Sequence, residues 1–215
     1  MDLKGKKVLV FGAGKSGIGA ADLLGSVEAQ PIIYDGNENL DKEAVLHKTN
    51  GTYTPEIWAG AFPEGEMESL DLVVLSPGVP TDLPLVKSFY EKGLPVWSEV
   101  ELAYRTGKGE VLAITGTNGK TTTTALLGKI MGDARESVFV VGNIGTAYTS
   151  KSLETREDSV TVAEISSFQL ETIEQFRPKV SAILNITEDH LNRHHTMEEY
   201  IRVKELITKN QGPED

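Results

Sequence analysis

Twice along this chain, a short apolar run is followed by a glycine-rich loop and then by a helix-like pattern. The run Lys7–Phe11 leads into Gly12–Gly17, and the run Val111–Thr115 leads into a second loop that begins at Gly116. A strand, a tight loop and a helix in this order begin a βαβ unit, whose parallel strands are buried on both faces. Two such beginnings predict two α/β domains, and we place them at residues 1–98 and 99–215.

The other apolar runs extend this alternation. Further strands are predicted at Pro31–Tyr34, Leu72–Leu75, Pro95–Trp97, Val138–Val141, Val160–Ala163 and Val180–Leu184. Helices are predicted near residues 16–24, 120–131 and 196–209, with a helical connector at 99–109. The predicted fold class is therefore α/β, with a Rossmann-like N-terminal domain. Because the second loop contains Gly119-Lys120-Thr121 between its strand and its helix, we predict that a P-loop ATPase domain follows. Since the polar residues 210–215 resemble a loop after a helix, we expect the second domain to be truncated.

Composition excludes several classes of function. The chain has 21 Lys and Arg against 32 Asp and Glu, a net charge of -11, which would repel a nucleic acid. Cysteine is absent, so disulfides, thiolate metal sites and a cysteine nucleophile are excluded. The apolar run near the N-terminus is too short for a signal peptide or a membrane span. We expect a cytoplasmic protein without a membrane partner.

The first glycine loop fits the pattern G-x-G-x-x-G between a strand and a helix. Glycines there permit a tight turn and let the backbone approach a pyrophosphate at the helix N-terminus. Asp35 ends the next strand, where an acid can accept a hydrogen bond from a ribose hydroxyl. Ser76-Pro77-Gly78 ends the third strand at the same sheet edge. A nucleotide site is one interpretation and a sheet-packing turn the other, and the motif alone does not identify the nucleotide.

The second loop, Thr115–Thr122, is the strongest local signal because Gly119-Lys120-Thr121 joins a strand to a helix. Backbone N–H groups can surround a phosphate there, and the helix dipole favours an anion. Lys120 can reach the β- and γ-phosphates, and Thr121 can offer its hydroxyl to Mg²⁺. The usual first glycine is replaced by Ile114, and we expect Gly116 to take its role. The alternative is a glycine-rich helix cap.

Polar residues follow two later strands. Glu164 ends one of them, where it is either a second Mg²⁺ ligand or an acid in solvent, and a polar Ser-Ser-Phe-Gln segment follows it. Asn185 and Glu188-Asp189-His190 follow the other strand. His190 can be a ligand or a structural residue, whereas His194 and His195 are expected at the surface.

The predicted last helix has a lysine in its apolar stripe. Lys204 continues the spacing of Tyr200 and Ile201 and is followed by Ile207. From the residues alone, the favoured interpretation is a lysine that extends its ammonium group to water.

Taken in order, these motifs resemble the Mur ligase family. The matching segments span nearly the whole chain: Lys6–Ala20, Ser76–Val79, Gly116–Thr124, Gly142–Gly145, Glu164–Glu171 and Asn185–His194. The GTNGKT sequence is also typical of other Mur ligases and of folylpolyglutamate synthase. Both therefore remain as alternative functions. The SSFQLE sequence is characteristic of the family's D-glutamate-adding members.

The resemblance implies an ATP-dependent amide ligase that adds D-glutamate to UDP-N-acetylmuramoyl-L-alanine through an acyl phosphate. Such a reaction belongs to peptidoglycan precursor synthesis, and hence to cell-wall biogenesis, cell shape and cell division. The family has a third, C-terminal domain with the D-glutamate site and further ATP contacts. We therefore expect the 215 residues alone to be inactive.

Site residues carried over by position form four groups. The substrate site would comprise Gly14, Lys15, Ser16, Asp35, Ser76, Pro77, Gly78, Asn143, Ser166 and Gln169. ATP would be bound by Gly116, Thr117, Asn118, Gly119, Lys120, Thr121 and Thr122. One Mg²⁺ would be held by Thr121 and Glu164, and a second by His190 and a carbamylated Lys204. The catalytic residues would be Lys120, His190 and Lys204. The acid usual in the family at Asn192 is missing, so Asn192 has no predicted role.

Two other classes of protein remain as alternatives. A dinucleotide-dependent oxidoreductase would use the first loop but leaves the second unexplained. A nucleotide-sensing module without catalysis would use both loops.

Overall fold

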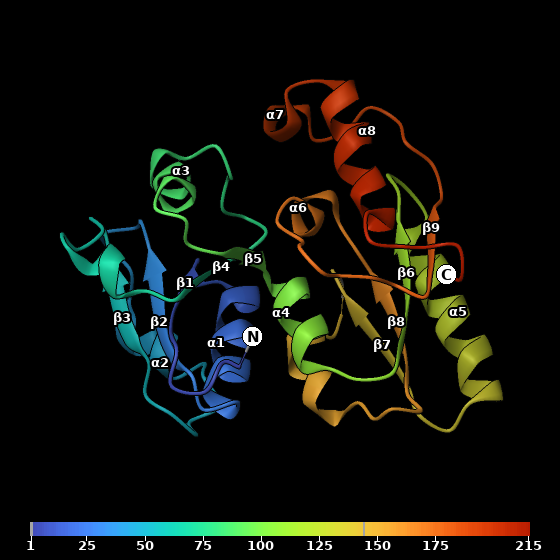
Figure 1. Cartoon of the computed structure of the whole chain (residues 1–215), viewed down its shortest axis with the longest axis horizontal. Coiled ribbons are helices and arrows are strands. Elements are labelled where there is room, and N and C mark those ends of the chain that lie inside the picture. The colour runs from blue at the N-terminus through green and yellow to red at the C-terminus, as the bar shows by residue number, and fades with distance from the viewer. Residues whose placement is uncertain (1, 144) are drawn as a thin grey trace. The chain divides into compact units, whose positions relative to one another are not determined.

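The computed structural model describes residues 2–143 and 145–215, and the chain divides into two compact units, Met1–Leu102 and Ala103–Asp215 (Figure 1). The predicted border after Ser98 lies at the start of α4 (Glu99–Thr106), close to the border between these units. Each unit has its own parallel sheet. The predicted α/β class is confirmed.

The first unit is built on a five-stranded parallel sheet with strand order β3-β2-β1-β4-β5. Its strands are β1 (Lys7–Phe11), β2 (Gln30–Asp35), β3 (Glu56–Ala59), β4 (Leu72–Leu75) and β5 (Val96–Ser98). Its helices are α1 (Lys15–Ser26), α2 (Lys42–Leu46) and α3 (Pro84–Glu91), with a 3₁₀ turn at Glu66–Ser69. Both faces of the central strands are buried, which explains their uninterrupted apolar runs.

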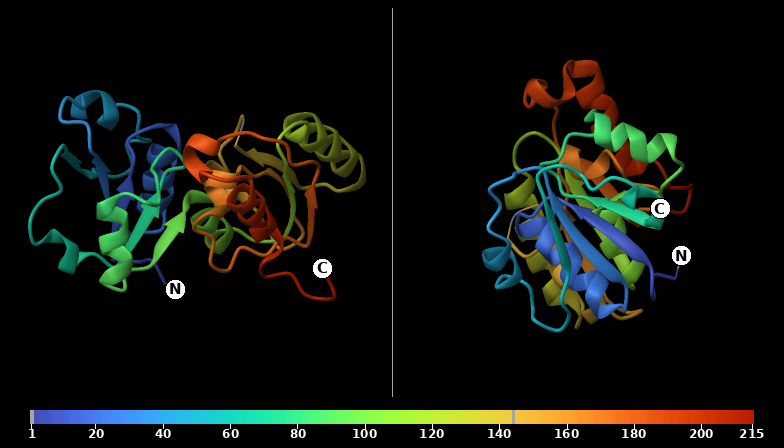
Figure 2. Two further views of the ribbon diagram at one scale, coloured as in Figure 1. Left: turned by 90° about the horizontal axis from the view of Figure 1, so that it is seen from above. Right: turned by 90° about the vertical axis from the view of Figure 1, so that its left-hand side faces the viewer.

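The two faces of the first sheet are covered by different helices. Leu9 and Phe11 of β1 join a core cluster that includes Phe89 of α3, while α1 packs along β1, β2 and β4 (Figure 2). The carboxyl ends of β1, β2 and β4 therefore meet at one edge, where the chain leaves the sheet in loops.

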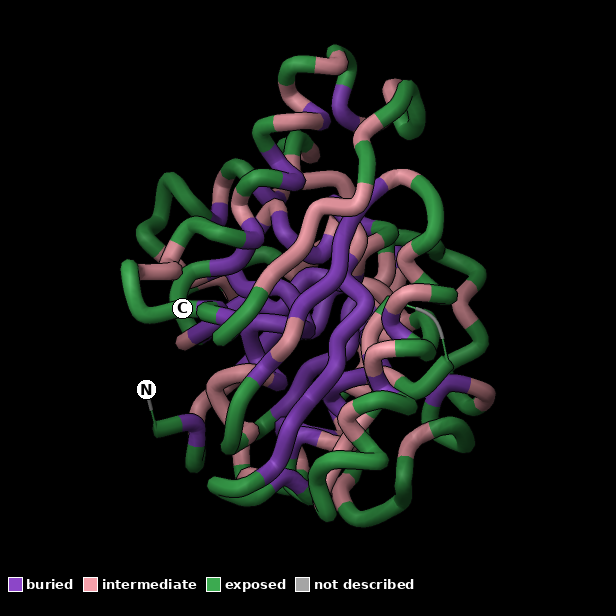
Figure 3. The backbone as a smooth tube through the Cα atoms, turned by 90° about the vertical axis from the view of Figure 1, so that its right-hand side faces the viewer, coloured by how far each residue is buried: buried purple, intermediate pink, exposed green. Residues whose placement is uncertain are grey.

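The second unit has a four-stranded parallel sheet with strand order β7-β8-β6-β9. Its strands are β6 (Glu110–Thr115), β7 (Val138–Gly142), β8 (Val160–Glu164) and β9 (Val180–Ile183). Its helices are α5 (Lys120–Ala134), α6 (Ser167–Leu170), α7 (Leu191–His194) and α8 (Met197–Glu205), with 3₁₀ turns at Tyr148–Ser150, Ser152–Glu154 and Leu206–Thr208. β8 is buried along its whole length. In Figure 3, the buried residues, in purple, lie in the interior, and the exposed residues, in green, lie mostly in the surrounding loops.

Helix α5 packs on β6, β7 and β8, and α6 and α7 both contact α8. In Figure 1, α6, α7 and α8 lie beyond the upper ends of the strands of this unit, where these strands terminate. The residues that follow β6, β8 and β9 are thus gathered at one sheet edge. In the part of the chain that the structure describes, no helix is both long and apolar enough to cross a bilayer.

Candidate active site

The first glycine loop is closed by contacts from two neighbouring strands. Gly12 has a φ of 112°, and its N–H donates to the carbonyl of Tyr34. The Ala13 N–H donates to Asp35 Oδ2 at 3.0 Å, and Ser76 Oγ donates to the Gly12 carbonyl at 3.3 Å. The second carboxylate oxygen of Asp35 accepts from the N–H of Asn37 at 3.0 Å. Asp35 and Ser76 therefore shape the loop directly.

Helix α1 begins immediately after this loop. A Cβ atom on Gly17 would lie only 1.8 Å from the Gly12 carbonyl oxygen, so only glycine allows this close packing. Gly14 caps the helix without a side-chain hydrogen bond. The structure brings all the predicted residues of this unit to the carboxyl edge of its sheet: Gly14, Lys15, Ser16, Asp35, Ser76, Pro77 and Gly78.

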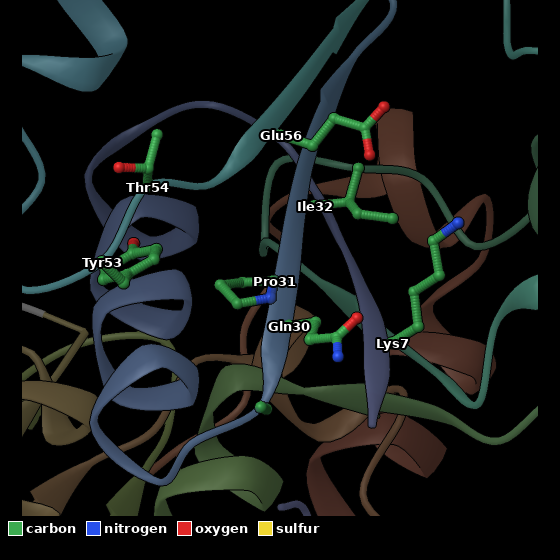
Figure 4. Close-up of a pocket in the computed structure, with 8 residues that line it drawn as sticks. Lys7, Gln30, Pro31, Ile32, Tyr53, Thr54 and Glu56 are labelled. Atoms are coloured by element: carbon green, nitrogen blue, oxygen red, sulfur yellow. The ribbon is translucent and has the colours of Figure 1, made fainter. Parts of the chain in front are cut away.

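A separate cavity of about 320 Å³ lies in the first unit (Figure 4). Its described lining includes Lys7, Gln30 and Glu56, which begin β1, β2 and β3. The cavity is therefore at the amino ends of these strands. None of the predicted site residues is among its described lining residues.

The second loop joins β6 to α5 through two glycines with positive φ. Gly116 has a φ of 148° and Gly119, the N-cap of α5, has a φ of 83°. No side chain caps this helix, and no described residue accepts from the N–H groups of Lys120, Thr121 and Thr122. Free N–H groups at a helix N-terminus attract an anion. The geometry therefore fits a phosphate.

Two lysines converge on this loop. Lys120 Nζ donates to the carbonyls of Gly116 at 3.0 Å and Thr117 at 2.9 Å, and Lys204 Nζ donates to the Gly116 carbonyl at 2.9 Å. The interpretation of Lys204 as a lysine reaching solvent is wrong, because it is only 1% exposed. Its ammonium group lies 4.7 Å from the ring centre of Tyr200. Burial, with the nearby charge of Lys120, lowers the pKa of Lys204 to about 8.

Glu164 ends β8 at the same edge and is almost fully buried. Asn143 Nδ2 donates to Glu164 Oε1 at 3.1 Å, and the Asn143 N–H donates to the Glu164 carbonyl at 2.9 Å. A Cβ atom on Gly142 would lie 2.0 Å from that carbonyl oxygen. Gly142 and Asn143 thus pack against Glu164. Ile144, which follows them, lies outside the described residues.

Ser166 and Gln169 form a capping box at the start of α6. Ser166 Oγ accepts from the Gln169 N–H at 3.3 Å, and Gln169 Oε1 accepts from the Ser166 N–H at 2.8 Å. Gln169 is buried, whereas Ser166 is partly exposed. Both side chains therefore stabilise the local fold of the segment predicted to contact substrate.

The histidines near α7 differ sharply in their surroundings. His190 is exposed, has a φ of 54° as the N-cap of α7, and lies with its Nε2 3.5 Å from Asp189 Oδ2. The expectation that His194 lies at the surface is wrong, because it is 2% exposed and its Nε2 lies 2.9 Å from Ser167 Oγ. Burial lowers the pKa of His194. His195 is exposed, as expected.

The buried position of His194 depends on a charged pair that the sequence does not reveal. Glu171 binds Arg193, with Arg193 Nε 3.1 Å from Glu171 Oε1, and the same carboxylate lies 3.6 Å from His194 Nδ1. Arg193 also lies over the ring of Phe168, at 5.1 Å from its centre. These contacts join α6 to α7, which are too short to be recognised from a periodic pattern.

The predicted magnesium ligands all lie at the carboxyl edge of the second sheet, at the start of α5, the end of β8, the N-cap of α7 and in α8. Thr121 and Glu164 offer oxygen atoms, which Mg²⁺ prefers. Lys204 as an ammonium group is a donor and does not suit a metal ion. Among the described residues, no three His, Asp or Glu side chains are grouped closely enough to hold a metal ion.

Two protein-family models match this chain. The model "Mur ligase MurD-like, N-terminal domain" matches residues 6–98, and "Mur ligase middle domain" matches residues 114–215. The UDP-N-acetylmuramoylalanine–D-glutamate ligase of Lachnospira eligens is 60% identical over 215 residues, which are 100% of this chain and 48% of that protein. The enzyme of the same name from Clostridioides difficile is 47% identical over 216 residues, again 100% of this chain and 48% of the relative. The chain thus spans about half the length of the curated relatives it matches.

Solved structures agree with the architecture. The UDP-N-acetylmuramate-alanine ligase of Thermotoga maritima has a TM-score of 0.51 and 25% identity over 95% of this chain and 47% of its own. A Neisseria meningitides ligase for UDP-N-acetylmuramate and L-alanyl-gamma-D-glutamyl-meso-diaminopimelate has a TM-score of 0.57 over 96% of this chain and 68% of its own, but its 16% identity supports the fold alone. Because the two sequence models leave only residues 1–5 and 99–113 unmatched, the chain belongs to the Mur ligase family, with a MurD-like N-terminal domain followed by Mur ligase middle-domain sequence.

Proposed function

We propose that the full-length protein is an ATP-dependent ligase that adds D-glutamate to UDP-N-acetylmuramoyl-L-alanine in the cytoplasm, as a step of peptidoglycan precursor synthesis. The main support is the phosphate-type loop at Gly116–Thr122, with its uncapped helix N-terminus and two convergent lysines. The names of the curated relatives support the choice of substrates. The chain spans about half the length of these relatives, and we propose that D-glutamate binds elsewhere in the full-length protein.

The chemical problem is that a carboxylate does not accept an amine, because its leaving group would be oxide. ATP supplies the phosphoryl group that turns the L-alanyl carboxylate into an acyl phosphate, from which phosphate leaves as the amine of D-glutamate forms the new C–N bond. The reactants are all anionic, so positive groups must offset their repulsion. This requirement matches the position of Lys120.

Different residues of the second loop would bind the phosphates and offset their negative charge. The N–H groups of Lys120, Thr121 and Thr122 would bind phosphate oxygens, and the Lys120 ammonium group would offset their charge. Thr121 and Glu164 would hold one Mg²⁺ through oxygen atoms. The remaining loop residues would shape the backbone around the phosphates.

Lys204 is proposed to carry a carbamate. A pKa of about 8 leaves part of the amine neutral near physiological pH, and a neutral amine can add to CO₂ and release a proton. The resulting anion would offer oxygen atoms and, with His190, hold a second Mg²⁺. Carbamylation would also remove the positive charge from the group that now donates to the Gly116 carbonyl.

The UDP part of the substrate is proposed to bind in the first unit. The loop residues Gly14, Lys15 and Ser16 would bind the UDP group together with Asp35 and the turn at Ser76–Gly78. In the second unit, Asn143 and Ser166 would contact the sugar–peptide part, and Gln169 would support Ser166 through the capping box.

The substitution Lys120→Ala in the full-length protein tests this function. We expect turnover to fall by on the order of 10²-fold or more, because the charge that offsets the phosphates is removed. Phosphate release in the presence of ATP, UDP-N-acetylmuramoyl-L-alanine and D-glutamate measures this, and calorimetry measures binding of the UDP substrate, which should be unchanged.

Lys129→Ala is the matched control, because Lys129 lies in the same helix, is exposed and pairs only with Asp133 among the described contacts. It should keep normal turnover. Normal turnover of Lys120→Ala would overturn the proposed function.

A further inference from the structure

The segment that follows β9 makes hydrogen bonds to the phosphate-type loop. The side-chain amide of Asn185 pairs with both backbone groups of Asn118. The Asn118 N–H donates to Asn185 Oδ1 at 2.9 Å, and Asn185 Nδ2 donates to the Asn118 carbonyl at 3.0 Å. The Asn185 carbonyl in turn accepts from the Thr117 N–H at 2.9 Å. One residue thus makes three hydrogen bonds to two consecutive loop residues.

The hydroxyl of Thr117 adds a second attachment to the same segment. Thr117 Oγ1 accepts from the Thr187 N–H at 3.0 Å and lies 3.2 Å from both the Thr187 carbonyl and the Tyr200 hydroxyl. A hydroxyl has one donor and two acceptor positions, so these three partners fill its hydrogen-bonding capacity. Thr117 and Asn118 are therefore fixed to the residues after β9 and to α8.

These bonds act where the backbone would otherwise be least constrained. Thr117 and Asn118 lie between Gly116 and Gly119, which both have positive φ and can adopt many other conformations. The Gly116 backbone also passes so close to Asn185 that a Cβ atom would lie 3.2 Å from the Asn185 carbonyl oxygen. Asn185 is well placed to select one loop shape from the many that two glycines permit.

We propose that Asn185 is a positioning residue that holds the loop in the shape that binds phosphate, an inference that rests on the proposed ATP site. Its amide uses a donor and an acceptor on Asn118, and it acts on phosphate only through the backbone. An aspartate at this position would lose the donor to the Asn118 carbonyl and would place a negative charge beside bound phosphate. Alanine would lose both side-chain bonds.

The experiment compares Asn185→Ala and Asn185→Asp with the wild type in the full-length protein. The loss of two neutral hydrogen bonds to the loop should raise the KM for ATP by about tenfold for Asn185→Ala. The added charge should raise it further for Asn185→Asp. The Kd of UDP-N-acetylmuramoyl-L-alanine should change little, because its proposed nucleotide site lies in the other unit. The Tm should also change little, because Asn118 and Asn185 are exposed and water can replace the lost hydrogen bonds.

Asn192→Asp is the matched control, because it introduces the same charge change as Asn185→Asp. Asn192 is exposed and has no assigned role. Its KM for ATP should equal that of the wild type. Hydrogen exchange gives a second readout: the N–H groups of Thr117 and Asn118 should exchange faster in Asn185→Ala than in the wild type. Added Mg²⁺-ATP should slow that exchange.

The outcomes separate this proposal from the proposed function. A wild type that neither binds nor uses ATP contradicts the ligase. A wild type that uses ATP, with an unchanged KM in both Asn185 variants, overturns the positioning role. A parallel loss of UDP-substrate binding and Tm, with no specific effect on ATP, also overturns it. Should Asn185→Ala fail to fold, the KM for ATP of Asn185→Asp tests the positioning role, since aspartate keeps the side-chain volume and one hydrogen bond.

Discussion

Lys204 is the residue whose surroundings conflict most with its charge. It is buried, its ammonium group donates to the Gly116 carbonyl, and the positive charge of Lys120 is nearby. Its pKa of about 8 in the folded protein is below the ordinary value of 10.5. Between these two values the unfolded chain binds more protons than the folded one, so the contribution of Lys204 to stability rises with pH. Below pH 8 Lys204 is protonated in both the folded and the unfolded protein, and the full free-energy cost of burying its charge remains.

The substitution Lys204→Met should therefore stabilise the metal-free protein near pH 7 by about 1–3 kcal/mol, because it removes a buried charge. This advantage should shrink as the pH rises from 8 towards 10.5. Urea unfolding at pH 7, 8.5 and 10 in CO₂-free buffer measures it. Lys129→Met, at an exposed position, should not stabilise the protein at pH 7. An advantage of the same size at every pH would contradict the burial of the charge.

At the scale of the element, helix α5 connects the phosphate-type loop to the sheet. Gly128 faces the sheet, and a Cβ atom there would lie 2.3 Å from Val140 Cγ2 of β7. Gly132, one turn later, has no atom within 4 Å of such a Cβ. The glycine at 128 is therefore required by packing, whereas the glycine at 132 is not.

These two glycines make a matched pair of substitutions to alanine. Gly132→Ala should stabilise the protein by up to about 1 kcal/mol, because alanine favours the helix. Gly128→Ala should destabilise it by about 1–3 kcal/mol, because the stiff valine side chain resists the added methyl group. Thermal unfolding of both variants measures the difference. Equal effects would mean that α5 does not contact β7 as described.

The elements that sequence predicted best are those with buried apolar runs. β1 has the predicted bounds, and β4 does too, because both faces of these strands are covered. β3 was missed because only Trp58 of its four residues is buried. The short helices α6 and α7 were missed because tertiary contacts, rather than periodicity, stabilise them. The capping box of α6 does have a sequence signature, serine followed three residues later by glutamine, that could have revealed its start.

At the scale of the whole molecule, the two units each have a glycine loop of their own at a sheet edge. Gly17→Ala should disrupt the first loop, because its Cβ would collide with a backbone oxygen that cannot move aside alone. We expect loss of UDP-substrate binding in the full-length protein, with ATP binding retained. Calorimetry with each ligand separates the two effects.

The control is Gly36→Ala, since Gly36 is exposed and a Cβ there meets no atom within 4 Å. It should bind both ligands normally. Loss of ATP binding in Gly17→Ala, with the UDP substrate still bound, would contradict the assignment of one ligand to each loop.

The sequence located both loops, but not the contacts that shape them. A glycine motif is a local pattern, and it predicts where a strand meets a helix. The bonds from Asn185 to Asn118 and from Lys204 to Gly116 join residues far apart in the chain, so no local pattern contains them. The burial of His194 was missed for the same reason, because it depends on Ser167 and Glu171.

These distant contacts also fix an order of events during translation. The first loop is closed by Ser76, 64 residues after Gly12. The second depends on Thr187, Tyr200 and Lys204, which follow their loop partners by 70, 83 and 88 residues. A ribosome releases the N-terminal part first, and domains generally fold as they emerge. The nascent chain therefore completes its first loop early, whereas the second loop has its full sequence long before it can take its final shape.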